Sequence, residues 1–525
     1  MWALGIGGLL HDGAAALLHH GEVVAAIEEE KLSRRPHGGG LPQYAIDACL
    51  DIAGVDFEQL DCVVLARPLG APEGSPFHLH VKSLFPKSRI VIADHHVAHA
   101  AAAFYPSPFE QSKVLTLDRR GDMRSGAWWN AEGPRLSLVD ELYASDSPAA
   151  FYSRVTELLG FRADREEHKV QWLSRAGGTR FVEPMIEMMG GASSTRPQVD
   201  HSYFDPARNT RGGFSDRFFK QLGISSSDRF SDEVRADLAS GLQSAVEAVF
   251  LRMVGEGENL CLGGGLAMNS LLIEAVERSG KFKNVWVQPV AGNAGTAIGC
   301  AFHAWHHVFR QSERKPLGTL CLGPSYDREQ VKRILENCKL RFQYLMTTDE
   351  LIKTAVGKLD DHQIVAWFQG RMEFGPRALG NRSILASPLN PYSTENLNVY
   401  IKHREPFRKF AASVPEELAS EYFDCGTNAR HLATVSRVRE PHLETFKAAL
   451  LDGDRIRVHA VCRDDNPLYW SLLHAAGQSS GMPVLFNTSF NLFDEPLVSD
   501  PRAALRSFYG SGIDSLFVNH FLLEK

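Results

Sequence analysis

The chain opens with MWALGIGGLLHDGAAALLHHGEVVAAIEE (residues 1–29), and this stretch decides the expected fold. Glycine-containing turns separate three apolar runs, at residues 4–6, 14–18 and 23–27. Short apolar runs separated by such turns are typical of strands joined as hairpins. Further apolar runs at 63–65 and 90–92 have the character of buried strands with helical segments on either side. Together these patterns predict a layered α/β architecture.

Length and composition favour a soluble protein of more than one domain. The 525 residues exceed the ~250–300 at which a single core stops growing. A net charge of −7 argues against nucleic acid as a partner. The eight cysteines lack CxxC spacing, and no apolar run reaches the ~18 residues that span a bilayer. With no basic segment before the first apolar run, we expect a cytoplasmic protein with no membrane contact.

The domain organisation is predicted from composition. Residues 314–325, which contain Pro316, Gly318, Gly323 and Pro324, are expected to link two halves, 1–318 and 319–525. Residues 180–215 are rich in Gly, Ser, Thr, Arg and Pro and are expected to form an insertion or lid. No internal repeat is visible in the sequence.

The most basic segment of the chain lies in the second half. Residues 370–384 read GRMEFGPRALGNRSI, with Arg371, Arg377 and Arg382 spaced among glycines. From 371 to 409 there are seven Lys or Arg and three Asp or Glu, although the whole chain is acidic. Guanidinium groups grip phosphate and carboxylate in bidentate fashion, and glycines let backbone N–H groups approach the same anion. This segment therefore predicts an anion site, such as one for a nucleotide or acyl phosphate.

Two segments of the first half carry further candidate chemistry. Gly263, Gly264 and Gly265 follow an apolar strand and precede a helix, an arrangement that can cradle phosphate. His95 and His99 lie one helical turn apart, and Asp118 ends a strand-like run at 113–117, so the three could bind one metal. The same spacing recurs at 303 and 307, where we expect core or surface histidines, so spacing alone decides nothing.

The arginine segment and Asn487-Thr488-Ser489-Phe490-Asn491 resemble signatures of the NodU/CmcH family of O-carbamoyltransferases. Weaker matches at 11–12, 28–30, 95–100 and 263–269 extend this resemblance over nearly the whole chain. The resemblance implies an actin-like, sugar-kinase-like ATPase fold in the N-terminal domain and a YrdC-like α/β fold in the C-terminal domain. It also implies that carbamoyl-adenylate is made from carbamoyl phosphate and ATP with Mg²⁺, and that the carbamoyl group then passes to a hydroxyl of a natural product or sugar.

The resemblance also assigns residues to roles. For adenylate formation it implies Arg371, Arg377, Arg382, Lys402, Arg404 and Arg408. For substrate or nucleotide binding it implies Gly263, Gly264, Gly265, Asn269, Glu373, Ser383, Asn487, Ser489 and Asn491, with Arg457 a weaker candidate. For transfer it implies a metal, usually iron, on His95, His99, Asp118 and position 293. His11 or Asp12 is the candidate general base, and a turn-capping pair is an equal alternative.

Several positions depart from the family pattern. Arg119 stands where the family has glycine, and Asn293 stands where it has a metal-binding aspartate. Residues 169–173, Lys-Val-Gln-Trp-Leu, replace Lys-x-Met-Gly-Leu, and Lys409 replaces a usual proline. A neutral ligand lowers affinity for a hard cation, so we expect weak metal binding or altered chemistry. Two alternatives stay open: an enzyme that uses the adenylate in another ligation or dehydration, and a non-catalytic nucleotide-binding scaffold.

Overall fold

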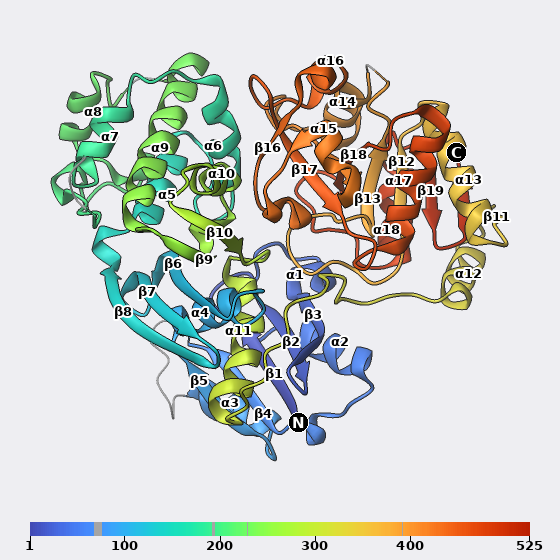
Figure 1. The fold of residues 1–525 in the computed structure, drawn as a ribbon, viewed down its shortest axis with the longest axis horizontal. Helices are drawn as coiled ribbons and strands as arrows, with labels where there is room; N and C mark the ends of the chain where they lie inside the picture. The colour runs from blue at the N-terminus through green and yellow to red at the C-terminus, as the bar shows by residue number, and fades with distance from the viewer. Residues whose placement is uncertain (68–75, 192–194, 228, 391) are drawn as a thin grey trace.

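The structure is a computed structural model that describes residues 1–67, 76–191, 195–227, 229–390 and 392–525. Within these residues the strands form two five-stranded sheets and one ten-stranded sheet (Figure 1). The first sheet has the order β3-β2-β1-β4-β5, with bounds Glu22–Glu28, Ala14–His19, Trp2–Gly7, Cys62–Ala66 and Arg89–Ala93. The second has the order β10-β9-β6-β7-β8, with bounds Phe282–Val287, Gly257–Gly263, Gln111–Gly121, Arg124–Glu132 and Arg135–Tyr143. The predicted α/β fold class is confirmed.

The two smaller sheets repeat one topology. In the first, β1 pairs antiparallel with β2 and parallel with β4, and these neighbours pair antiparallel with β3 and parallel with β5. In the second, β6 takes the place of β1, β7 and β8 those of β2 and β3, and β9 and β10 those of β4 and β5. The sequence shows no sign of this duplication, because two sheets can share the order and direction of their strands without sharing a pattern of side chains.

Helices α4 (His95–Phe104) and α11 (Thr296–His303) pack together between these sheets. The close contact depends on glycine. A Cβ on Gly299 would lie 1.8 Å from the carbonyl oxygen of Ala98, and one on Gly5 would lie 2.0 Å from that of Ala297. Helix α4 begins where the Asp94 side chain accepts the N–H groups of His96 and Val97. This packing sets α4 against β6, so its histidines lie near the end of that strand.

A helical layer covers the other face of the second sheet and includes the predicted insertion. Its helices are α5 to α10, with bounds Pro148–Leu158, Glu167–Leu173, Val182–Met188, Asp216–Leu222, Asp232–Met253 and Ser270–Arg278. Within 180–215, residues 192–194 lie outside the described residues. Met185, Met188 and Tyr203 of this segment are buried in the core beneath the sheet. The described residues of 180–215 do not line the cavity described below, and the assignment of this segment as an insertion or lid stays a prediction.

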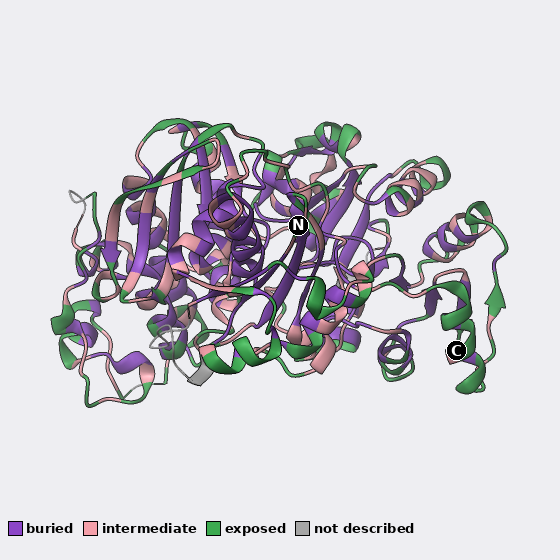
Figure 2. Cartoon of the chain, turned by 90° about the horizontal axis from the view of Figure 1, so that it is seen from below, coloured by how far each residue is buried: buried purple, intermediate pink, exposed green. Residues whose placement is uncertain are grey.

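The ten-stranded sheet lies in the C-terminal part, drawn from yellow to red in Figure 1. Its order is β11-β20-β19-β12-β13-β18-β14-β17-β16-β15, with bounds Gln343–Tyr344, Phe521–Glu524, Ser515–Val518, Val365–Phe368, Arg382–Ala386, Leu485–Ser489, Ala411–Pro415, Arg455–Val461, Ser436–Val438 and Phe423–Asp424. The longer helices beside it are α12, α13, α17 and α18, with bounds Arg328–Asn337, Thr348–Asp360, Pro467–Ser480 and Pro501–Tyr509. Figure 2 shows that strands in the interior are buried and that exposed residues gather on the outer helices and loops.

The predicted linker is an ordered strap between the two parts. Leu320 and Leu322 are buried, and the carbonyl oxygen of Leu322 accepts the backbone N–H of Ala26 in β3. The backbone N–H of Gly323 in the strap donates to the carbonyl oxygen of Met372 in the arginine segment, and the N–H of Met372 donates to the carbonyl oxygen of Pro324. The boundary at residues 318 and 319 itself stays a prediction. Among the described residues, no helix is long and apolar enough to cross a bilayer.

Candidate active site

A cavity of about 590 Å³ is lined by residues from both parts of the chain. From the N-terminal part come His11, Asp12, His37, Asp118, Gly265, Asn269 and Asn293. From the C-terminal part come Arg377, Arg404, Arg408, Lys409, Arg457, Asn487, Ser489 and Asn491. A smaller hollow of about 300 Å³ shares His11, Asp118 and Asn293 in its lining and extends to His95. The two sets of residues predicted for separate steps thus face one space.

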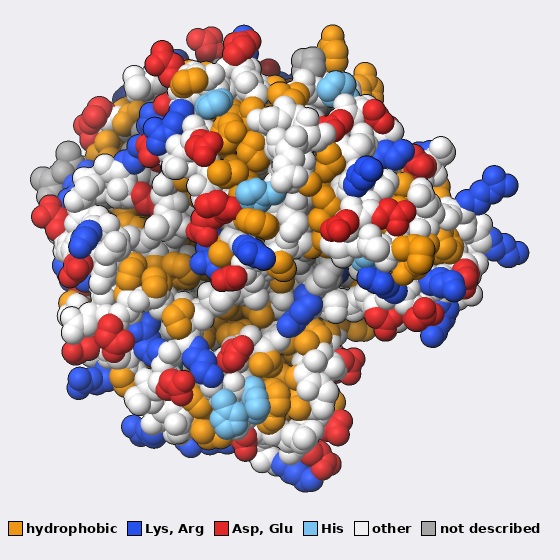
Figure 3. All heavy atoms as spheres, turned by 45° about the vertical axis from the view of Figure 1, so that its right-hand side comes forward, with side chains coloured by type: hydrophobic (Ala, Val, Ile, Leu, Met, Phe, Trp, Pro, Cys, Tyr) orange, Lys and Arg blue, Asp and Glu red, His pale blue; other side chains and the backbone are white. Residues whose placement is uncertain are grey.

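The C-terminal wall of the cavity carries unneutralised guanidinium groups. Within the described chain, Arg377, Arg404 and Arg457 have no carboxylate partner, and Arg404 Nη2 and Arg457 Nε are buried without a hydrogen-bond partner. Burial, together with a neighbouring arginine in each case, lowers the pKa of Arg377 to about 9 and that of Arg457 to about 10. On the face in Figure 3, acidic and basic side chains are interspersed, so this excess of cations belongs to the cavity rather than to that face. A cavity wall with this excess of positive charge favours the binding of an anion.

Lys402 supports the same wall from behind. Its Nζ donates to Asn491 Oδ1 at 2.6 Å and to the Asn491 carbonyl oxygen at 2.9 Å, and also to the carbonyl oxygen of Ser489. Burial, with Arg404 and Arg408 nearby, holds the pKa of Lys402 well below its usual value. Asn487 on β18 donates to the Ala378 carbonyl oxygen at 3.1 Å, and its Oδ1 is left buried without a partner among the described residues. Lys402 therefore positions Ser489 and Asn491, which line the cavity, and it does not line the cavity itself.

Four predicted residues of the arginine segment do not reach the cavity. Arg382 is fully buried and donates to the carbonyl oxygens of Gln369, Gly370, Pro324 and Asn381. Arg371 donates to carbonyl oxygens at 24, 322 and 323. Glu373 Oε1 accepts three backbone N–H groups, and Ser383 Oγ accepts one. This placement corrects the expectation that Arg371 and Arg382 grip an anion directly, because backbone carbonyls occupy their guanidinium groups. They shape the loop that presents Arg377.

On the N-terminal wall, Asp12 lies between two histidines. Its Oδ2 is 2.8 Å from His11 Nδ1, and its Oδ1 is 2.7 Å from His37 Nδ1. Burial would raise the pKa of Asp12, but these two hydrogen bonds outweigh it and hold the pKa below its usual value. The bond to Asp12 raises the pKa of His11 despite burial. An Nδ1–H held by a carboxylate leaves Nε2 as the basic atom, as a general base requires.

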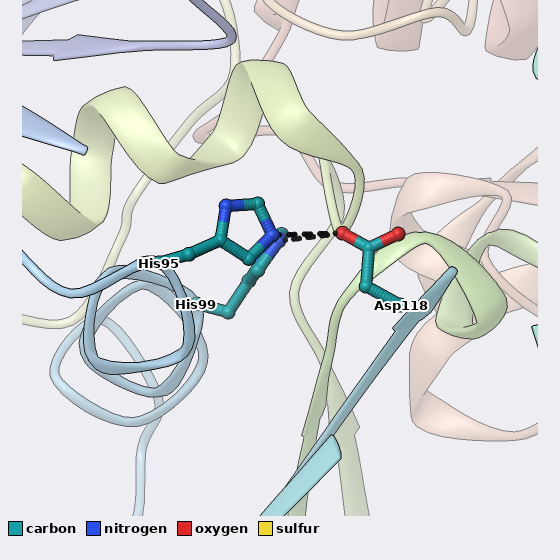
Figure 4. Close-up of side chains that lie close together, drawn as sticks. All are labelled: His95, His99 and Asp118. Carbon is teal, nitrogen blue, oxygen red and sulfur yellow. Dashed lines mark hydrogen bonds and ion pairs between the residues drawn. The ribbon is translucent and has the colours of Figure 1, made fainter. Parts of the chain in front are cut away.

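His95, His99 and Asp118 meet as the sequence predicts. Both histidines extend from α4 toward Asp118 in β6 (Figure 4), with Nε2 atoms 3.0 and 3.1 Å from Asp118 Oδ2. Burial would raise the pKa of Asp118, but the hydrogen bonds from the two histidines hold it well below its usual value. One ligand atom from each residue lies within 4.8 Å of the others, so the three fit one metal ion. His303 and His307 form no such group among the described residues, where His307 Nε2 bonds the hydroxyl of Tyr105 at 3.0 Å.

Asn293 contacts the candidate base and lines both hollows together with Asp118. Its Nδ2 donates toward His11 Nε2 at 3.0 Å, and its Oδ1 is buried without a partner among the described residues. An unpartnered amide oxygen beside Asp118 suits a neutral fourth ligand. Arg119 lines both hollows as well, and its guanidinium pairs there with Asp164.

The glycine loop contributes one residue to the cavity. Gly265 lines it, whereas Gly263 and Gly264 do not. Gly264 has a φ of +91°, and a Cβ there would lie 2.1 Å from the Leu117 carbonyl oxygen, so the turn against β6 requires glycine. Asn269 lines the cavity while it caps α10 and bonds Gln243. The loop thus holds the end of β6, and with it Asp118, in place.

Sequence reasoning missed several lining residues. His37 follows an Arg-Arg-Pro run in a glycine-rich loop, and only its contact with Asp12 marks it. His168 and Trp172 of α6 line the cavity, and Trp172 lies under Arg457, with the guanidinium carbon 5.3 Å from its ring centre. The departure at 169–173 was the available signal for Trp172. Lys409, noted only as a substitution for proline, also lines the cavity.

Comparison of the sequence with known protein families identifies the class of protein. Residues 3–71 and 76–302 match the family described as "Carbamoyltransferase N-terminus", and residues 356–525 match "Carbamoyltransferase C-terminus". The chain therefore belongs to the carbamoyltransferase family, and it is a carbamoyltransferase enzyme.

Similar proteins come from several bacteria. The nodulation protein NolNO of Sinorhizobium fredii is 31% identical over 98% of this chain and 79% of its own length. NolO of Bradyrhizobium diazoefficiens is 32% identical over 82% of this chain and 79% of its own length. An uncharacterised protein of Synechocystis sp. is 32% identical over 99% of this chain and 96% of its own length. Among solved structures, HypF from T. kodakarensis covers 59% of this chain and 48% of its own, with 13% identity and a TM-score of 0.34.

Proposed function

We propose that this enzyme makes carbamoyl-adenylate from carbamoyl phosphate and ATP and transfers the carbamoyl group to a hydroxyl of a small molecule. The observation that carries the proposal is the shared cavity, which has an arginine wall on one side and the His11–Asp12 pair on the other. Anionic substrates would meet at the arginine wall, and a proton would be accepted at the opposite wall.

Arg377, Arg404, Arg408 and Arg457 would bind the phosphate groups of both substrates. Inorganic phosphate leaves carbamoyl phosphate, and a carbamate oxygen bonds the α-phosphorus of ATP as pyrophosphate leaves. Charge builds on phosphoryl oxygens in these steps, and fixed cations in a dry site stabilise that charge strongly. The unpartnered Arg404 Nη2, Arg457 Nε and Asn487 Oδ1 would find their partners in the bound substrates. Mg²⁺ would accompany ATP as in other phosphoryl-transfer sites.

In the transfer step, His11 Nε2 would accept the proton of the acceptor hydroxyl as its oxygen attacks the carbamoyl carbon. The bond from that carbon to the adenylate oxygen breaks, and AMP leaves. Asp12 holds the histidine through Nδ1 and stabilises the imidazolium that forms. A divalent metal such as Fe²⁺ on His95, His99 and Asp118 would supply Lewis-acid polarisation when bound. The Asn293 amide would give up its contact with His11 Nε2 to the incoming hydroxyl.

The proposal is tested by ATP–pyrophosphate exchange with and without carbamoyl phosphate, followed by a panel of sugar and natural-product alcohols. Exchange that requires carbamoyl phosphate, and a carbamoylated alcohol with one AMP per product, supports it. Exchange without any carbamoylated product would favour the alternative in which the adenylate serves another ligation or dehydration, as Asn293 and Arg119 suggest. Absence of exchange would contradict the proposal.

A further inference from the structure

A buried ion pair joins the end of β3 to the arginine segment. Lys31, in the short helix α1 (Glu29–Ser33), is 2% exposed, and its Nζ lies 2.9 Å from Glu28 Oε2. The same ammonium donates to the carbonyl oxygen of Glu373 at 2.8 Å and to that of Gly375 at 2.6 Å. Glu28 Oε1 in turn accepts the backbone N–H of Gly375 at 2.8 Å. The ammonium therefore makes two hydrogen bonds to the arginine segment and one ion-pair contact within its own segment.

Such a pair is poorly explained by stability alone. Moving two charges out of water costs several kcal/mol per ion, and apolar side chains of similar size often fill such a site at least as well. Both charged groups of this pair also hydrogen-bond the backbone of residues 373–375, so a shift of that backbone would leave buried charged groups without these partners. Here the elements fixed are β3 with α1 in the N-terminal part and residues 373–375 in the C-terminal part.

On the C-terminal side, the pair fixes the loop that presents Arg377. The Glu373 carboxylate organises this loop by accepting the N–H groups of Leu379, Asn381 and Arg382. Gly375 has a φ of +107°, and a Cβ there would lie 2.8 Å from Val290 Cγ2. Two residues later, Arg377 enters the cavity and donates to the Pro289 carbonyl oxygen at 3.0 Å. A shift at Gly375 would therefore move Arg377.

On the N-terminal side, the same helix reaches the candidate base. Glu30, next to Lys31, accepts the backbone N–H of His37 at 2.9 Å through its carboxylate. His37 Nδ1 contacts Asp12, which holds His11. The five-residue helix α1 thus touches both walls of the cavity, and Glu28 itself lines the cavity.

We propose that Lys31 and Glu28 are positioning residues that hold the two walls in register, so that carbamoyl-adenylate passes between them without reaching water. This inference rests on the proposed function. When register is lost, water attacks the carbamoyl carbon, the bond to the adenylate oxygen breaks, and carbamate and AMP form without transfer. Lys31 and Glu28 thereby limit wasteful loss of the intermediate, and they act through the backbone of residues 373–375.

The test compares AMP release in the absence of an acceptor with carbamoyl-phosphate-dependent ATP–pyrophosphate exchange. In Lys31→Met the ratio of AMP release to exchange should rise about tenfold over the wild type. The double variant Glu28→Gln/Lys31→Met removes both charges, which protects folding, and should raise the ratio as well. The matched control is Arg175→Met, which breaks the Arg175–Asp452 pair between the two parts, away from the cavity lining. Its ratio should stay at the wild-type value.

Amide hydrogen exchange gives a second readout, in which Leu379, Asn381 and Arg382 should exchange faster in Lys31→Met than in Arg175→Met. An unchanged ratio in folded Lys31→Met or in the double variant overturns the inference, as does an equal rise in the control. A parallel loss of both activities with an unchanged ratio assigns the pair to stability only and also overturns it. If the wild type shows no carbamoyl-phosphate-dependent exchange, the proposed function fails first, and this inference fails with it.

Discussion

The side-chain amide of Asn293 donates toward Nε2 of His11 at 3.0 Å, the atom of that imidazole that faces away from Asp12. One residue therefore contacts the candidate base, and its amide oxygen, which has no partner among the described residues, belongs to a side chain that lines the same hollow as His95 and Asp118. Its neutrality allows both roles, because a carboxylate there would be drawn to a metal and could not donate to the imidazole.

We expect Asn293→Asp to bind divalent metal more tightly than the native protein. The substitution adds a negative charge beside Asp118, and charge count is a main determinant of affinity for hard cations. Metal retained after equal dialysis measures the effect, with Asn293→Ala as the control that removes the ligand atom. If the native protein keeps a full equivalent and the aspartate variant gains nothing, Asn293 is not a ligand.

His99→Ala should lose metal and carbamoyl transfer while it keeps carbamoyl-phosphate-dependent exchange. His99 is buried and contacts Asp118 of the N-terminal wall, whereas the arginines proposed for adenylate formation lie on the opposite wall. Exchange, bound metal and carbamoylated product are measured on the same preparation, with His303→Ala as a histidine control outside the metal group. Loss of exchange in a folded His99→Ala protein would show that the walls do not work separately.

Arg377→Ala should lower the exchange rate by about 10²–10³-fold and leave folding largely intact, since a preorganised charge contact of this kind is worth that much. Thermal unfolding measured alongside exchange separates the two effects. Native exchange in this variant would remove the arginine wall from the mechanism.

Arg382→Ala should instead destabilise the protein by about 3–5 kcal/mol, because a fully buried guanidinium and four carbonyl oxygens lose their partners. Denaturant unfolding measures this loss. A stable Arg382→Ala protein without exchange would contradict the structural role and restore Arg382 to the site.

Stability should fall as the pH drops below about 6.5. Burial lowers the pKa of His459 to about 3, and burial with nearby Arg430 lowers that of His431 to about 3. Between about pH 3 and 6.5, each of these histidines binds a proton in the unfolded state but not in the folded state. Each therefore lowers the free energy of unfolding by about 1.4 kcal/mol for every pH unit of acidification. His459→Gln should make the slope of unfolding free energy against pH shallower by about that amount, and an unchanged slope would contradict the account.

Local patterns in the sequence predicted much of the fold and of the metal group. Short apolar runs predicted the strands β1 to β5, and the spacing of four residues predicted that His95 and His99 lie on one face of a helix. The roles of Arg371 and Arg382 were not predictable, because spacing shows that arginines are close in sequence but not whether carbonyl oxygens surround them. The contact of His37 with Asp12 and that of Lys31 with Gly375 join residues 25 and 344 positions apart. Only tertiary packing produces such pairs.

The most direct measurement is detection of carbamoyl-adenylate on the enzyme. The protein is mixed with ATP, Mg²⁺ and carbamoyl phosphate without an acceptor, quenched rapidly, and analysed by mass spectrometry for bound nucleotide. The account predicts carbamoyl-adenylate with an equal amount of pyrophosphate, both absent from Arg377→Ala. Formation of ADP in place of pyrophosphate, or carbamoylation of an acceptor with no adenylate in the quenched sample, would contradict it.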